Sequence, residues 1–415
     1  MSETPAPGTP AETVEPAPPV DSKDEGTAGR SVLRDIAESS TLLIILAIVA
    51  SLVLSGILIL IADAEFRAAL PYFFSRPGDT FQAIGDALGT AYSAIWQGAV
   101  YNSGGATFAQ KIAPFMATLS AATPLIFAGL GIGIGFRAGL FNIGAQGQIL
   151  IGATLGAMVG FMWHLPFPLH LIVAVIGCAI GGAMWGFIPG VLKAKTGAHE
   201  VITTIMLNYV ALNLVSWLLS LEAFQRPGSD NPQSPVIDTT AQYPKLFGDQ
   251  YTLSLAFVLA LVAAVFAWWL MERSTLGFQF RAVGANPSAA HTAGMNVSRV
   301  TILVMVVAGA LSGLAASAQI LGTQPSLTVG IAGSLGFDAI TVALLGASRP
   351  FGIVMAAVLF GGLKAAGPTL QVEAGLPIDI VLVIQSLIVL FIAAPPLVRF
   401  LFRLPTPRTV KAVTA

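Results

Sequence analysis

Charged residues are scarce in this chain. Of its 415 residues, only 10% are Asp, Glu, Lys or Arg, whereas 55% are hydrophobic and the mean hydropathy is +0.80. Soluble domains carry about 25% charged residues, so this composition excludes a soluble globular protein and predicts a membrane protein with several spans. The 20 basic and 21 acidic residues nearly balance. The overall charge therefore gives no reason to expect a nucleic-acid partner.

Residues that carry catalysis are scarce as well. The single cysteine, Cys178, excludes an internal disulfide, and the four histidines show no spacing typical of a metal site. No lysine follows a glycine, so the chain has no phosphate-binding P-loop of its own. No GxSxG sequence and no pair of carboxylates indicates hydrolysis. We therefore predict no catalytic residue, no metal and no cofactor, and a chain that is not an enzyme.

Apolar runs of membrane-spanning length predict about ten transmembrane helices in an all-α fold. Lys and Arg near their ends place both chain termini in the cytoplasm by the positive-inside rule. We expect a disordered cytosolic tail at 1–38, a membrane domain at 39–404 and a second cytosolic tail at 405–415. An amphipathic stretch near 81–100 is expected along the outer surface. The spans are predicted near 41–62, 113–134, 148–163, 169–192, 201–221, 251–271, 300–322, 323–347, 351–370 and 378–397.

Two glycine-rich segments interrupt this pattern. Residues 139–152 (GLFNIGAQGQILIG) follow the second span, and residues 330–346 (GIAGSLGFDAITVALLG) follow the seventh. Spans two to five begin outside and spans seven to ten begin inside, so the two broken helical segments occupy corresponding places in halves of opposite orientation. This arrangement predicts an inverted-topology repeat, which many transporters share, and paired broken segments indicate a solute path.

Polar side chains in and near the first broken segment are candidates for that path. Asn142, Gln146 and Gln148 are amides, which suit a neutral hydroxylated solute, and polar groups within a membrane need internal hydrogen bonds or water. Thr204 and Asn208 share one face of the fifth predicted span. We assign all five to a translocation pathway. Two alternatives stay open: the amides could tie down an irregular turn, and the helix face could bond to a neighbouring helix.

Asp338, in the second broken segment, is the only acidic residue between Glu272 and Glu373. A carboxylate within a membrane indicates function by default, so we add Asp338 to the predicted pathway. It could also cap a helix. No facing Lys, Arg or second acid is predicted for it in its half of the chain. This weakens the hypothesis of an ion-coupled carrier, which would use such a carboxylate.

The polar loop 272–299, between two predicted spans, is unusually long and basic for so apolar a chain. Three arginines within it place it in the cytoplasm. Asn286 can cap a short helix, Pro287 fits its first position and Gly294 can end it. Such a helix could serve as a contact site for another protein. The alternative is a solvated connector whose arginines only fix the topology.

Three segments of the chain resemble a known family. They are FRAGLFNIGAQGQILIGA (136–153), HEVITTIMLNYVALNL (199–214) and STLGFQFRAVGANPSAAHTAGMNV (274–297). They resemble permease subunits of ABC importers, in the simple-sugar and nucleoside branch of the branched-chain amino-acid and ribose permease family. One departure is Gln146, where that group often has an acidic residue before Gly147, which argues against a charge-based role at this position.

The resemblance implies a set of partners. Residues 284–294 would form a coupling helix that docks on a cytoplasmic ABC ATPase. A second homologous permease would complete the pore, and an extracytoplasmic solute-binding protein or lipoprotein would deliver the solute. The resemblance assigns docking on the ATPase to five residues: Gly284, Asn286, Pro287, Ala290 and Gly294.

These observations predict the translocation subunit of an ATP-driven importer in a bacterial cell membrane, surrounded by lipid. It would move a nucleoside or a simple sugar inward by alternating access. The alternative is an ion-coupled secondary transporter of a small polar solute. The inverted repeats and broken helices of such a carrier would look the same in sequence as those of an ATP-driven importer.

Overall fold

The computed structural model describes residues 40–229 and 231–404; the predicted tails at 1–38 and 405–415 lie outside these ranges. Within them the chain consists of helices and turns, with two isolated β-bridges and no strand. The helices are α2 (Ser40–Ala62), α3 (Ala64–Ala69), η1 (Leu70–Tyr72), α4 (Pro77–Ala99), α5 (Phe108–Arg137), α6 (Ala145–Met162), α7 (Leu169–Thr196), α8 (Glu200–Leu218), η2 (Thr239–Ala241), α9 (Ala256–Arg273), α10 (Thr275–Ala285), α11 (Pro287–Thr292), α12 (Val297–Ala318), η3 (Gln319–Thr323), α13 (Leu335–Leu345), α14 (Pro350–Ala374), α15 (Asp379–Ala393) and α16 (Pro395–Leu401).

The prediction of an all-α polytopic membrane protein is confirmed. In the described ranges, eight helices are long and apolar enough to cross a membrane, or nine if α15 and α16 count as one bent span. Ten spanning helices are not found. The predicted span 323–347 holds only α13, whose 11 residues are too short to cross. The inverted-topology repeat stays a prediction.

Two predicted span ends are wrong for local reasons. The tenth predicted span stops at Ala393, because Pro395 disfavours helical geometry at Ala394 and opens a new helix, α16, bent by 92° from α15. The sixth predicted span was expected from residue 251. Its helix, α9, begins at Ala256, because the residues before it form a turn with an isolated bridge between Lys245 and Ser254.

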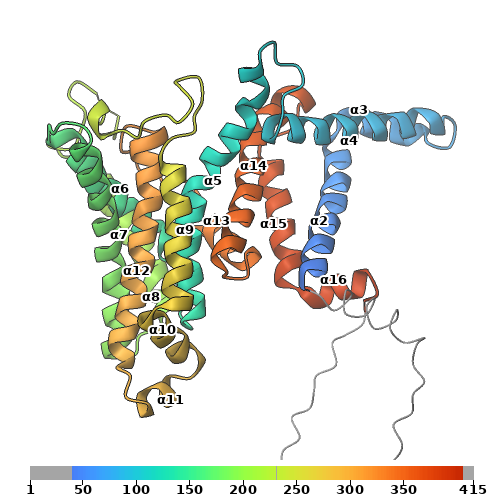
Figure 1. Ribbon diagram of the computed structural model, residues 1–415. Coiled ribbons are helices and arrows are strands. Elements are labelled where there is room, and N and C mark those ends of the chain that lie inside the picture. Colours follow the sequence, from blue (N-terminus) through green and yellow to red (C-terminus); the bar gives the residue numbers. More distant parts are fainter. Residues whose placement is uncertain (1–39, 230, 405–415) are drawn as a thin grey trace, which may run out of the picture.

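Close packing of α7 on α12 forms one side of the bundle. Figure 1 shows these two helices with α6, α8 and α9 on one side of α5, and α13, α14 and α15 on the other. The close approach depends on glycine: a Cβ on Gly182 would meet the Gly309 carbonyl oxygen, and one on Gly313 would meet the Cys178 carbonyl oxygen. Small residues of this kind allow membrane helices to pack backbone to backbone.

The predicted amphipathic stretch near 81–100 is the helix α4, which lies crosswise to α2 and α14 in Figure 1. The Tyr92 hydroxyl donates to the Leu52 carbonyl oxygen of α2 at 2.6 Å. Gly98 packs against Ala366 and Thr369 of α14. The far end of α4 pairs with α3 instead of the bundle, through Thr80, whose hydroxyl donates to a carbonyl oxygen of that helix.

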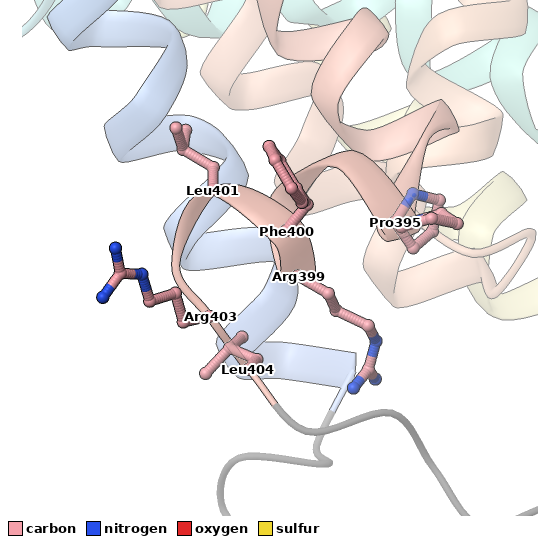
Figure 2. A pocket seen from close by; sticks show the side chains of 7 residues that line it. Pro395, Arg399, Phe400, Leu401, Arg403 and Leu404 are labelled. Carbon is pink, nitrogen blue, oxygen red and sulfur yellow. The ribbon is translucent and has the colours of Figure 1, made fainter.

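The short helix α16 separates apolar from basic side chains. Figure 2 shows Phe400 and Leu401 on the side of the bundle, whereas Arg399 and Arg403 point away from it. Phe400 is 82% exposed, so nothing in the described chain covers this aromatic ring. An apolar face beside arginines is typical of a helix that lies in the interface of a membrane.

The bundle has two distinct ends. At one end α10 and α11 lie between α9 and α12; we call these two helices the handle. At the other end the loops 219–255 and 324–329 meet, because Ser234 and Leu327 exchange hydrogen bonds of 3.0 Å and 2.8 Å. We call this the loop end. The second broken segment therefore starts at the loop end and runs toward the handle end.

Candidate functional site

The short helix predicted inside loop 272–299 is confirmed as α11. The Asn286 side chain accepts a hydrogen bond from the Ala289 N–H at 3.0 Å, and Pro287 takes the first position. Gly294 follows with φ of +83°, a left-handed conformation that favours glycine. A second helix, α10, was not predicted: Ser274 caps it by accepting from the Gly277 N–H at 2.9 Å. The expected stretch 284–294 is therefore divided between the end of α10 and the whole of α11.

The five predicted docking residues occupy two kinds of position. Asn286, Pro287 and Gly294 are exposed at the tip of the handle. Ala290 is only 4% exposed and packs inward. Gly284 faces the bundle: a Cβ there would stand 2.6 Å from the Ala138 carbonyl carbon. The first three are thus free to contact another protein, and the last two attach the handle.

The handle is joined to the first broken segment by two contacts. Gly284 lies against Gly139, which has φ of +70°. Next to them, Glu272 accepts from Arg137 at 2.7 Å and lies 3.7 Å from Arg281. Because Arg137 ends α5 and Glu272 lies near the end of α9, these contacts hold α10 against the start of segment 138–144.

A groove of about 800 Å³ lies between α10 and the start of α12. Its lining combines apolar side chains with arginines: Leu276, Phe278, Met295, Arg273 and Arg299. It opens beside the exposed residue Gly294. The handle thus offers a concave, basic surface next to a protruding short helix.

Three of the predicted pathway residues, Asn142, Gln148 and Asn208, hold the first broken segment in shape, whereas the fourth, Thr204, bonds within its own helix α8. Asn208 accepts from the Gly147 N–H at 2.8 Å and donates to the Ile143 carbonyl oxygen at 2.9 Å. Asn142 donates to Gln148 at 3.1 Å, and both side chains are 1% exposed. Thr204, also buried, donates to the carbonyl oxygen of residue 200 at 2.7 Å. These contacts fit the alternative in which the polar groups tie down an irregular turn.

Gln146 connects the two broken segments. Its Nε2–H donates to the Gly333 carbonyl oxygen at 2.6 Å, and its Oε1 accepts from the Gly336 N–H at 2.9 Å. One amide therefore bonds to both sides of the turn that opens α13. An ionised glutamate could accept from Gly336 but could not donate to Gly333. The glutamine at position 146 thus makes two contacts that an ionised acidic residue could not both make.

Asp338 lies in the first turn of α13 and does have a basic partner, contrary to the prediction. The Lys364 ammonium of α14 donates to its Oδ2 at 3.3 Å, and the Ser334 hydroxyl donates to the same oxygen at 2.7 Å. Sequence reasoning missed Lys364. Its signal was present, because it is the only charged residue in the apolar run 351–370.

No group of three or more His, Cys, Asp or Glu side chains that could hold a metal occurs within residues 40–229 and 231–404. Taken together, a helical membrane bundle, a protruding handle and a polar meeting point of two broken helices define the membrane subunit of a transporter.

Comparisons with known proteins identify the family. Residues 115–393 match the family model described as the permease component of the branched-chain amino acid transport system, and the chain belongs to this family. It is 38% identical to the guanosine ABC transporter permease protein NupP of Bacillus subtilis over 76% of this chain and 88% of that protein. It is 36% identical to the nucleoside permease NupB of Lactococcus lactis over 72% and 83%.

A third relative, the glucose ABC transporter permease protein TsgB13 of Haloferax volcanii, is 36% identical over 65% of this chain and 73% of its own length. No solved structure matches the chain. As a permease component, the chain is a multi-pass membrane subunit that translocates and does not catalyse. ATP hydrolysis resides in a separate chain, and a substrate-binding partner belongs to such systems.

Proposed function

We propose that this chain is the translocation subunit of an ABC importer that carries a nucleoside into a bacterial cell by alternating access. The observation that carries the proposal is 38% identity to a guanosine permease over 88% of that protein. A simple sugar is the second candidate solute, because a glucose permease is 36% identical. The ion-coupled carrier is disfavoured: Lys364 already neutralises Asp338, the carboxylate that such a carrier would need.

The handle would be the ATPase-docking site. Three observations support this: the exposed tip of α11, the adjacent basic groove, and the absence of a P-loop in the chain itself. Arginines in and around the handle favour a cytoplasmic position for it. Arg399 in α16 and Arg403 just after it point away from the bundle and favour the same side for the C-terminal end, with Phe400 among the lipids. Both termini would then be cytoplasmic.

Coupling would follow the contacts of the handle. Closure of the ATPase pair would move α11 and α10, and the contact of Gly284 with Gly139 would carry this movement into segment 138–144. Gln146, seven residues further on from Gly139, would pass it to α13. Because one amide holds both broken segments, they would move together as the pore changes its open side.

The proposal includes two further partners. A second homologous permease would complete the pore, and a solute-binding protein or lipoprotein would dock at the loop end, opposite the handle. Gln146 and Asp338 would line the pathway. Asn142, Gln148 and Asn208 would shape its wall from behind by holding the first broken segment, and Thr204 would lie buried on the same face of α8 as Asn208.

Reconstitution in liposomes with the ATPase, the second permease and the binding protein tests the proposal. The variants Ser288→Glu and His291→Glu place a charge on the exposed face of α11 and should abolish association with the ATPase and ATP-driven guanosine uptake. The control Thr90→Glu, exposed on α4, should leave both unchanged. Uptake driven by a proton or sodium gradient without the ATPase would refute the proposal.

A further inference from the structure

The ion pair between Asp338 and Lys364 lies deep in the bundle, far from either end. The helix α13 ends near the handle, since Ala347 and Arg349 line a hollow with Arg137 and Glu272. A helix of 11 residues is about 16 Å long, roughly half of a hydrocarbon core of about 30 Å. Asp338, in the first turn of α13, is therefore placed near the middle of the membrane.

The pair is accessible in spite of this depth. The side chain of Asp338 is 16% exposed and that of Lys364 is 42% exposed. Both hydrogen bonds to the carboxylate go to Oδ2. Within residues 40–229 and 231–404, Oδ1 accepts no hydrogen bond and the ammonium donates to no other group. The site therefore keeps one carboxylate oxygen and N–H donors for a further ligand.

The backbone beside the pair is accessible too. Gly330 and Gly333 precede α13 in irregular conformation and are exposed. Charged side chains and irregular backbone at membrane depth do not face lipid; they line water-filled paths or protein contacts. The surface around Asp338, Lys364 and Gly333 therefore faces water or another protein surface, and not lipid.

Resting on the proposed function, we propose that the Asp338–Lys364 pair is a solute-binding point in the pore, and that it recognises vicinal hydroxyl groups of a sugar ring. Oδ1 accepts a hydrogen bond from one hydroxyl, and the Lys364 ammonium donates to the oxygen of its neighbour. The pair is neutral overall, so it holds a neutral solute without requiring a counter-ion. The same chemistry serves a nucleoside ribose and a free sugar.

Transport by the complete transporter in liposomes tests this assignment. Uptake of guanosine is compared with that of 2′,3′-dideoxyguanosine, and uptake of glucose with that of 2-deoxyglucose, each with the binding protein saturated. Because the same saturated binding protein serves every permease variant, a change in the rate ratio arises in the permease. The rate ratio is the uptake of the hydroxylated solute divided by that of its deoxy analogue. For the solute that the transporter accepts, we expect Asp338→Asn and Lys364→Gln each to lower this ratio about tenfold, mainly by slowing uptake of the hydroxylated solute.

Two controls separate binding from structure. Glu373→Gln makes the same carboxylate-to-amide change on an exposed part of α14 and should leave the ratio unchanged. The exchange Asp338→Lys with Lys364→Asp keeps an ion pair but moves the carboxylate to α14, and should not restore the ratio. Co-purification with the ATPase reports assembly for each variant.

An equal slowing of both solutes by Asp338→Asn and Lys364→Gln would overturn the assignment, as would full recovery of the ratio in the exchanged pair. Either result would leave the pair a structural tie between α13 and α14. Failure of the proposed function would give a different result, in the unsubstituted protein: it would then neither bind the ATPase nor take up any of the four solutes.

Discussion

The contact between the handle and the first broken segment gives the sharpest prediction, which is the effect of Gly284→Ala. The new methyl carbon would stand 2.6 Å from the Ala138 carbonyl carbon and 2.7 Å from the Arg137 carbonyl oxygen. Carbon atoms in ordinary contact are about 3.5–4.0 Å apart, so the two backbones must separate by about 1 Å. Neither side can yield by turning a side chain, because both obstacles are backbone atoms.

The size of the effect follows from that overlap. Overpacking by one methyl group costs about 1–3 kcal/mol. If the strain is relieved by detachment of the handle, the equilibrium ratio of attached to detached handle falls about 5- to 150-fold. Since Asn286 and Pro287 at the tip of α11 are untouched, the ATPase should still bind. We expect the ratio of solute imported to ATP hydrolysed to fall by about fivefold or more.

Proteoliposomes that contain the complete transporter allow both rates to be measured together. The control is Gly89→Ala, the same change on α4, where a Cβ would meet nothing within 4 Å. It should leave the ratio of transport to hydrolysis unchanged. An unchanged ratio in Gly284→Ala, with thermal stability lowered or not, would refute the role of this contact in coupling.

Three further substitutions test what holds the bundle. Asn208→Ala leaves two backbone groups of the broken segment without partners and should lower the free energy of unfolding by about 2–4 kcal/mol, whereas Asn213→Ala, exposed on the same helix, should change it little. Gly313→Val forces α7 away from α12 and should prevent accumulation of folded protein in membranes, measured by size-exclusion chromatography. Glu272→Gln weakens a half-exposed ion pair, so thermal unfolding should show a loss of about 1 kcal/mol or less that disappears in high salt.

Local signals in the sequence predicted the tip of the handle but not its base. Asn286, Pro287 and Gly294 fix the ends of α11 by chemistry that acts within a few residues, and all three positions are as expected. The helix α10 went unpredicted because its arginine and its two glycines are typical of a loop. Its stability comes from tertiary contacts, in which Phe280 and Val283 are buried in the core.

In the candidate pathway too, local spacing predicted part of the arrangement and long-range contacts decided the rest. Spacing along one helix correctly placed Thr204 and Asn208 on a buried face. It could not tell a pore lining from a set of structural ties, because that depends on segment 138–144 folding back against α8. The bonds from Asn208 to Gly147 and Ile143 cross more than sixty positions of the chain, and helix periodicity carries no information at that distance.

The pairing of Asp338 with Lys364 changes what the second broken segment can do. An isolated carboxylate at this depth would attract a proton or a cation, and it would point to ion coupling. A carboxylate whose charge is matched by an ammonium 3.3 Å away no longer does so, yet it keeps its directional hydrogen-bonding capacity. A neutral pair of this kind suits an importer that draws its energy from ATP at the handle, since the pore then has to recognise an uncharged solute and has no need to carry an ion with it.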